Sequence, residues 1–222
     1  MQESAIYKFS QANYDLGAQY FSKTRKFLWS DLWIFKSYLK KGDKVLDFGC
    51  GNGRLIQLLS GFGVDYWGVD VSERLIKLAK RKYPGGNFRK IDVFFRDYRK
   101  FELNSFDVVF SIGVFHHFPL GEKRKKILER LVMLLRENGV LIITVWNLNL
   151  RRFKKYLGDK KQGFSVFKDQ RQKFVFERFL YRWENKELQD FLQASNLEIL
   201  DSGYTLRKKE KVNLYCVARK TV

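Results

Sequence analysis

From residue 42 onward the chain alternates short apolar runs with amphipathic stretches. The apolar runs are bounded by glycine, proline or polar residues, and they predict strands over 44–50, 64–71, 87–93, 105–114 and 139–146. Between them, apolar residues at three- and four-residue spacing predict helices over 54–62, 72–83 and 122–138. We expect Ser72 to cap the second helix, Pro84 to end it, and Asn138-Gly139 to end the third. This alternation predicts an α/β fold with a parallel sheet.

The last part of the chain has a different pattern. Residues 185–195 predict a helix, and two short runs joined by a basic turn, 197–204 and 211–219, predict an antiparallel hairpin. Residues 147–184 show neither the apolar spacing of a helix nor the apolar runs of the predicted strands, so we expect them to be an insertion. The whole chain is then one domain with four parts: a helical segment (1–42), a core (43–146), the insertion (147–184), and a C-terminal helix with its hairpin (185–222).

Positive charge dominates the composition. The 222 residues include 43 Lys and Arg against 24 Asp and Glu, which gives a formal charge of +19. Such a charge attracts polyanions, so nucleic acid is the first candidate partner, and a solvated lysine-rich surface is the alternative. The two cysteines make no disulfide framework, and the sequence has neither an apolar leader nor a run of about 18 apolar residues. We therefore expect a cytoplasmic protein.

A glycine-rich turn follows the first predicted strand, in the stretch "VLDFGCGNGR" over 45–54. Glycines permit a tight strand-to-helix turn and a close approach of the backbone to a ligand. Asp70 ends the next strand, about where an acid reaches ribose hydroxyls. The third glycine of a dinucleotide fingerprint is missing, because Asn52 and Arg54 stand at its positions, and Asp47 adds an anion. The turn therefore suits a ligand with ribose, adenine and a cationic end, which describes S-adenosylmethionine.

Residues 44–146 resemble the class I S-adenosylmethionine-dependent methyltransferases, on "DFGCGNG", Asp70, Asp92 and "FDVVFSIGVFHHF" together. The resemblance implies a seven-stranded Rossmann-like sheet with helices on both faces and an antiparallel last strand. It implies that Asp70 holds the ribose and that Asp92 meets the adenine amino group. The cofactor-binding residues that it implies are Asp47, Gly49, Gly51, Gly53, Asp70, Val71, Asp92, Val93, Ser111 and Ile112.

The only two histidines of the chain, His116 and His117, are neighbours just after the fourth predicted strand. Neighbouring side chains on an extended segment point to opposite sides, so the pair makes a poor clamp for a metal. Ligands of open α/β sheets lie beyond the carboxyl ends of the strands. We therefore expect at least one of these histidines to line the pocket for the methyl acceptor, and packing alone is the alternative.

The chain also resembles the tRNA wobble-uridine methyltransferases, which esterify 5-carboxymethyluridine. The resemblance lies in "SIGVFHHF", "YFSKTRKFLW" (20–29), "RFLYRWENKELQDFL" (178–192) and "DSGY" (201–204). It implies that Arg25 holds the acceptor carboxylate, and that a small zinc-binding activator subunit is a candidate partner. An ionised carboxylate needs no strong base. With a neutral acceptor, His116 or His117 would take the proton.

The insertion interleaves cations with aromatic residues. Over 151–182 it carries eleven Lys or Arg against three Asp or Glu, with Phe153, Tyr156, Phe164 and Phe167 among them. Cations neutralise phosphates and aromatic rings stack on splayed bases, so RNA binding is one interpretation and a solvated lid the other. The expected substrate-binding residues are Arg151, Arg152, Lys154, Lys155 and Arg178.

Two other functions remain open from the sequence. One is a methyltransferase for an acidic metabolite, which would turn over without RNA. The other is a non-catalytic RNA-binding subunit with this fold, which would bind the cofactor without transferring a methyl group.

Overall fold

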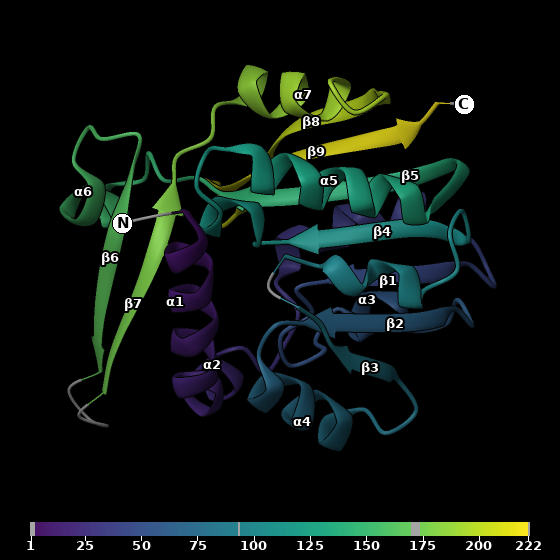
Figure 1. Cartoon of the computed structure of the whole chain (residues 1–222), viewed down its shortest axis with the longest axis horizontal. Coiled ribbons are helices and arrows are strands. Elements are labelled where there is room, and N and C mark those ends of the chain that lie inside the picture. Colours follow the sequence, from purple (N-terminus) through teal and green to yellow (C-terminus); the bar gives the residue numbers. More distant parts are fainter. Residues whose placement is uncertain (1–2, 93, 170–173, 222) are drawn as a thin grey trace.

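Seven strands form one sheet in the computed structural model, which describes residues 3–92, 94–169 and 174–221, and the side chains of 5–92, 94–166 and 177–221 (Figure 1). The strands are β1 (Lys44–Phe48), β2 (Asp65–Asp70), β3 (Asn87–Lys90), β4 (Phe106–Ile112), β5 (Leu135–Trp146), β8 (Leu197–Arg207) and β9 (Glu210–Lys220). Their order is β3-β2-β1-β4-β5-β9-β8. Strands β1 to β5 are parallel, and β9 is antiparallel to both of its neighbours. The predicted seven-stranded α/β sheet is confirmed.

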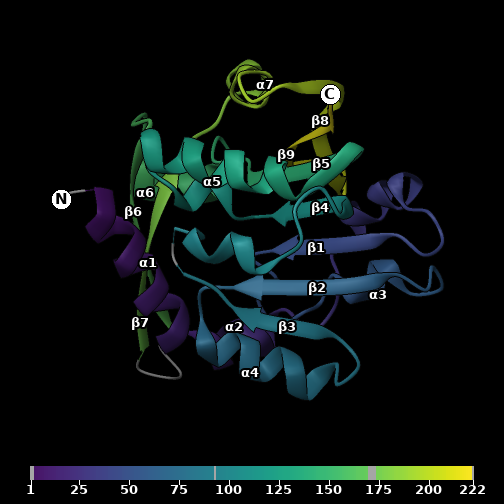
Figure 2. The ribbon, with the colours of Figure 1, turned by 45° about the vertical axis from the view of Figure 1, so that its right-hand side comes forward.

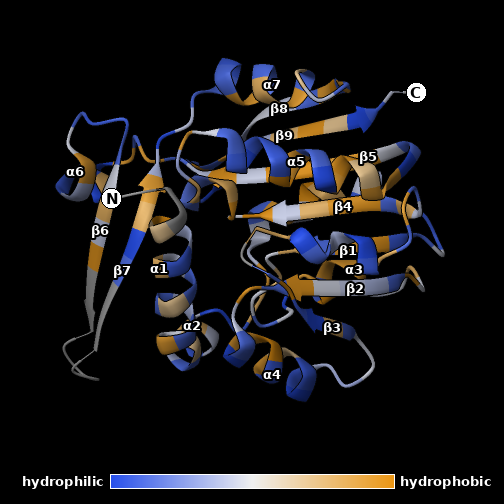
Figure 3. Cartoon of the chain, viewed as in Figure 1, coloured by the Kyte–Doolittle hydropathy of each residue, from blue (hydrophilic) through white to orange (hydrophobic). Residues whose placement is uncertain are grey.

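Helices cover both faces of this sheet. One apolar core holds residues of η1 (Ser30–Tyr38), α3 (Ile56–Leu59) and α4 (Glu73–Lys82). The core on the other face holds residues of η2 (Arg96–Lys100), α5 (Glu122–Leu134) and α7 (Asn185–Gln193). Side chains of a strand alternate between faces, so Val45 enters the first core and its neighbour Leu46 the second. Figure 3 shows the apolar residues gathered along the central strands.

Four further elements stand at the end of the sheet where the parallel strands finish. Helices α1 (Glu3–Leu16) and α2 (Ala18–Thr24) lie next to a separate two-stranded sheet of β6 (Gln162–Asp169) and β7 (Phe174–Tyr181). Helix α1 contacts β7, and both views place the pair beyond the strand ends (Figures 1 and 2). The region expected to be an insertion therefore carries a β-hairpin and the short helix α6 (Arg151–Leu157), which together flank the carboxyl edge of the sheet.

The predicted element boundaries differ from the observed ones at two helices. Ser72 caps α4 as expected, because its hydroxyl accepts the Leu75 N–H at 3.1 Å. The helix expected over 54–62 shrinks to α3, since its first turn is wound by bonds from three residues back, such as Ile56 N–H to the Gly53 carbonyl. The helix expected over 122–138 ends at Leu134, because Leu135 turns extended and pairs with Phe106.

Among the described residues, no helix is both long enough and apolar enough to cross a membrane.

Candidate active site

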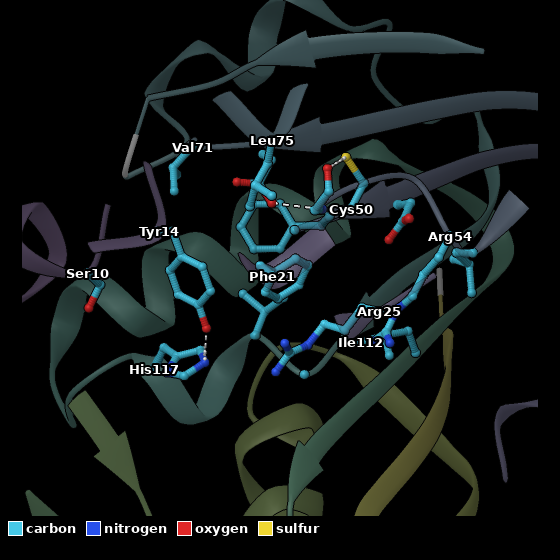
Figure 4. Close-up of a pocket in the computed structure, with 18 of the residues that line it drawn as sticks. Ser10, Tyr14, Phe21, Arg25, Cys50, Arg54, Val71, Leu75, Ile112 and His117 are labelled. Carbon is cyan, nitrogen blue, oxygen red and sulfur yellow. Dashed lines mark hydrogen bonds between the residues drawn. The ribbon is translucent and has the colours of Figure 1, made fainter. Parts of the chain in front are cut away.

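A cavity opens at the carboxyl ends of β1, β2 and β4, where the sequence placed the cofactor (Figure 4). Its floor is the glycine turn after β1 together with the residues that end β2 and β4. Helix α1 and the segment after it form the opposite wall. The side chains that this wall contributes are Tyr7, Ser10, Gln11, Tyr14, Phe21, Arg25, Leu28, Trp29 and Leu32.

The glycine turn has no space for a side chain at Gly49 or at Gly51. Gly49 and Gly51 have φ of +80° and +56°, a region that favours glycine. A Cβ on Gly49 would lie 2.3 Å from Val114 Cγ2, and one on Gly51 would lie 2.9 Å from the Phe21 ring. The turn is fixed to β2, since the Gly49 N–H donates to the Val69 carbonyl at 2.8 Å. Glycine at these two positions therefore lets Val114 and Phe21 pack directly against the backbone of the turn.

Two buried carboxyl groups face the cavity from the strand ends. Asp70 accepts the backbone N–H of Gly51 at 2.9 Å and that of Ser72 at 2.8 Å, and burial raises its pKa to about 6. Asp47 accepts the Tyr66 hydroxyl at 2.9 Å, and burial raises its pKa to about 7. A cationic ligand would favour the ionised forms of both groups. Acidic side chains beside a bare glycine turn thus fit a ribose and a cationic end.

The two histidines occupy different places. Residues 115–117 form a 3₁₀ turn, η3, rather than a strand end, and the two imidazole rings lie 4.1 Å apart. His117 lines the cavity, whereas His116 is fully buried behind it and accepts the Trp146 N–H at 3.3 Å. The expectation that at least one histidine lines the cavity thus rests on His117. Burial lowers the pKa of His116 well below its ordinary value.

His117 is held as one neutral tautomer. Its Nδ1 lies 2.9 Å from the Phe179 carbonyl of β7, which only accepts, so Nδ1 carries the proton. Its Nε2 then accepts the Tyr14 hydroxyl of α1 at 2.6 Å (Figure 4). Burial lowers the pKa of His117 to about 3. The ring therefore bridges α1 and β7 across the edge of the cavity, and it stays uncharged at neutral pH.

Comparison with known proteins agrees with this geometry. A family model described as a methyltransferase domain matches residues 46–143, which span the glycine turn, Asp70 and both histidines. Residues 46–143 therefore form a methyltransferase domain.

Curated relatives of this methyltransferase domain are named after tRNA. The chain is 35% identical over 139 residues to a tRNA (carboxymethyluridine(34)-5-O)-methyltransferase of Arabidopsis thaliana, covering 63% of this chain and 33% of that protein. It is 35% identical over 155 residues to a protein of that name from Xenopus tropicalis, covering 67% and 23%. The chain thus spans a third or less of these relatives. A putative methyltransferase of Encephalitozoon cuniculi matches end to end, at 25% identity over 99% of this chain and 97% of that protein.

Solved structures share the fold. An S-adenosylmethionine-dependent methyltransferase of Methanosarcina mazei superposes with a TM-score of 0.69 at 20% identity, covering 88% of this chain and 99% of that one. A putative methyltransferase of Haloferax volcanii, solved in complex with the Trm112 methyltransferase activator, superposes with a TM-score of 0.70 at 16% identity, covering 96% and 98%.

Several residues expected at the cofactor do not line the cavity of the methyltransferase domain. The Asp92 carboxylate forms a two-pronged pair with Arg96, at 3.0 and 2.8 Å, outside the cavity. Gly53 packs against the Phe88 ring, and Ser111 is fully buried. Val93 lies outside the described residues. The expected residues that do line the cavity are Asp47, Gly49, Gly51, Asp70, Val71 and Ile112.

Three arginines line the cavity or the cleft next to it. Arg25 lines the cavity, and its guanidinium lies 4.2 Å from the centre of the Phe21 ring. Arg178 of β7 lies 4.7 Å from the centre of the Trp146 ring and shares a neighbouring cleft with Arg25. Arg54, a cation for which the sequence predicted no role, also lines the cavity. Its position directly after the glycine turn was the only available signal.

The four expected RNA-binding cations of α6 are all exposed: Arg151, Arg152, Lys154 and Lys155. Arg152 pairs with Glu210 at 2.6 Å and lines an open cleft that shares Arg25, Trp29 and Trp146 with the cavity. Phe153 stacks on Trp146, with ring centres 5.5 Å apart. The expected contribution of Phe167 lies outside the described side chains. A basic, aromatic surface thus continues outward from the cavity.

Proposed function

We propose that this chain transfers a methyl group from S-adenosylmethionine to the carboxymethyl side chain of a tRNA wobble uridine, forming a methyl ester. The observation that carries this proposal is the 35% identity to two proteins named tRNA (carboxymethyluridine(34)-5-O)-methyltransferase. The cation-lined entrance supports it, because the acceptor and the RNA that presents it are both anionic.

The cavity has residues for each part of the methyl donor. Asp70 would hold the ribose hydroxyls, the glycine turn would lie against the donor, and Asp47 would face its cationic end. When bound, S-adenosylmethionine supplies an electrophilic methyl group on a sulfonium. The protein's own contribution is to hold the acceptor in line and to exclude water.

A carboxylate acceptor agrees with the state of His117. A carboxylate is already ionised at pH 7 and gives up no proton when it takes a methyl group, so no general base is needed. His117 is neutral, and both of its nitrogens are engaged, by Phe179 and by Tyr14. We infer that His117 orients Tyr14 and β7 around the acceptor, while Arg25 and Arg178 attract the carboxylate.

RNA binding by the exposed cations of α6 and recognition by an activator subunit belong to the same proposal. The four cations are exposed, and Arg152 lines the cleft that shares Arg25 with the cavity. The Haloferax volcanii fold neighbour was solved with the Trm112 activator, so a co-purified partner of that kind is worth testing. The cytoplasmic location also stays a prediction.

The proposal is tested on total tRNA treated with mild alkali, which hydrolyses methyl esters and exposes their carboxylates. The chain, with and without an activator subunit, is incubated with this tRNA and radiolabelled S-adenosylmethionine. We expect label in the methyl ester of 5-carboxymethyluridine, identified by nucleoside mass spectrometry and released by a second alkali treatment. Alkali-stable label, or equal turnover on small acids without RNA, would contradict the proposed acceptor.

A further inference from the structure

Arg54 is a buried cation with an unused hydrogen-bonding group. Its side chain lines the cavity while the residue is only 9% exposed. Among the residues that the structure describes, nothing accepts a hydrogen bond from its Nη1, and no carboxylate lies within 4.0 Å of its guanidinium. A buried N–H without an acceptor is costly, and an ordered water, an ion or a ligand satisfies such a group.

The orientation of Arg54 is set by a chain of contacts from the β8–β9 hairpin. Its guanidinium lies 3.7 Å from the centre of the Trp29 ring, and Arg207 lies 4.6 Å from the same ring. Arg207 donates to the buried Asp31 at 2.9 Å from Nε and 2.5 Å from Nη2. The Asp31 carboxylate also accepts bonds from two side chains of the hairpin, Thr205 at 2.6 Å and Asn213 at 2.8 Å. Arg207, held by the buried Asp31, thus packs against the tryptophan on which Arg54 stacks.

Arg54 and Arg25 both line the same cavity, and Figure 4 labels both. Burial lowers the pKa of Arg54 to about 9, and the nearby charge of Arg25 lowers it further in the same direction. Asp47 opposes this effect, but its own raised pKa leaves it partly protonated at neutral pH. Two like charges in one buried cavity would be stabilised by an anion between them.

We propose that Arg54 and Arg25 form a carboxylate-binding subsite beside the glycine turn. Guanidinium groups match carboxylates in shape and hydrogen-bonding pattern. Two carboxylates could occupy the subsite: that of the amino-acid end of the methyl donor, and that of the acceptor. The second source rests on the proposed function, whereas the first does not depend on it.

The experiment compares two ligands on matched variants. S-adenosylhomocysteine carries the amino-acid carboxylate, and 5′-methylthioadenosine keeps the nucleoside but lacks that carboxylate. Arg54→Met keeps an unbranched side chain but is shorter and removes the guanidinium, with its charge and its stacking on Trp29. Arg54→Lys keeps the charge, and Arg81→Met is an exposed control on α4. Circular dichroism and thermal unfolding establish that each variant is folded, and calorimetry measures the two affinities.

If the subsite holds the donor, Arg54→Met weakens S-adenosylhomocysteine by about tenfold or more and changes 5′-methylthioadenosine by less than about twofold. Arg54→Lys then falls between wild type and Arg54→Met. If the subsite holds the acceptor, both affinities stay at the wild-type level and the KM for alkali-treated tRNA rises by a similar factor.

Two results overturn the subsite. One is an Arg54→Met protein with wild-type affinity for both ligands and a wild-type KM. The other is an equal loss of affinity for both ligands, which would mean that Arg54 only supports the glycine turn. A wild-type protein without activity on tRNA contradicts the proposed acceptor, but the calorimetric comparison still reports on the donor.

Discussion

Replacing Gly49 by alanine tests whether the glycine turn is shaped by steric exclusion. At a φ of +80° an alanine costs about 1–2 kcal/mol of the free energy of unfolding. Its Cβ would also lie 2.3 Å from Val114 Cγ2, and relieving such an overlap in a packed site costs roughly 1–3 kcal/mol more. We therefore expect Gly49→Ala to lose about 2–5 kcal/mol in total.

The chain offers a matched control for the backbone part of this cost. Gly42 has a φ of +81°, and among the residues that the structure describes a Cβ there meets nothing within 4 Å, so Gly42→Ala should lose only about 1–2 kcal/mol. Val114→Ala removes the overlapping methyl group and leaves Val114 Cβ as the nearest atom, 3.5 Å from the new Cβ. Val114→Ala should therefore be less destabilising in the Gly49→Ala variant than in the wild-type protein, or even stabilising there.

Urea unfolding of wild type, the three single variants and the double variant gives the free energies, and calorimetry with S-adenosylhomocysteine reports the state of the turn. Gly49→Ala should lose cofactor affinity, whereas Gly42→Ala should keep it. Equal destabilisation by the two glycine substitutions, or no recovery with Val114→Ala, would refute the steric argument.

Three further predictions follow from the site. Asp47→Asn should become more stable relative to wild type as pH rises from about 4 to 7. The wild-type protein loses stability over this range because its buried Asp47 carboxyl, with its raised pKa, resists the ionisation that the unfolded chain undergoes. A difference in the free energy of unfolding in urea that does not change with pH over this range would contradict the raised pKa. His117→Ala should slow methyl transfer by roughly 10- to 100-fold and leave the affinity for S-adenosylhomocysteine nearly unchanged, and Tyr14→Phe should act in the same direction; wild-type rates in both would make the bridge purely structural. Replacing four cations of α6 by Glu should reduce the salt dependence of tRNA binding: Arg151, Arg152, Lys154 and Lys155. The logarithm of the binding constant falls with the logarithm of the salt concentration by about 0.7 per phosphate contacted. Equal slopes for the wild-type protein and the variant would show that α6 does not contact the RNA.

The sequence predicted the sheet well because its strands are continuous apolar runs between glycine turns. The predicted end of the helix over 122–138 was wrong because a contact with another strand determines where this helix ends. The segment "LREN" has good helix formers and is followed by Gly139, yet Leu135 pairs with Phe106 of β4, and nothing local to the helix reports that partner. The hairpin of β6 and β7 in the region 147–184 was not predicted, because basic residues interrupt the alternation of apolar and polar positions in these strands.

The candidate site was predicted where one segment carries it and missed where distant segments meet. The glycine turn and Asp70 are close in sequence, so spacing was informative. The partners of His117 are Tyr14, 103 residues before it, and Phe179, 62 residues after it, and no sequence period links them. Arg54 was read only as a departure from a fingerprint, because its burial and its stacking on Trp29 arise from tertiary packing.

The position of β9 in the sheet has a consequence for how the protein is made. The ribosome delivers β8 before β9, yet β9 lies between β5 and β8 and pairs with both. Until residues 210–220 emerge, the inner edge of β5, with the buried Leu141, Ile143 and Val145, has no neighbour on that side. An unpaired apolar edge is a template for association with other chains. The nascent protein therefore passes through a stage in which a chaperone that covers this edge would protect it from aggregation.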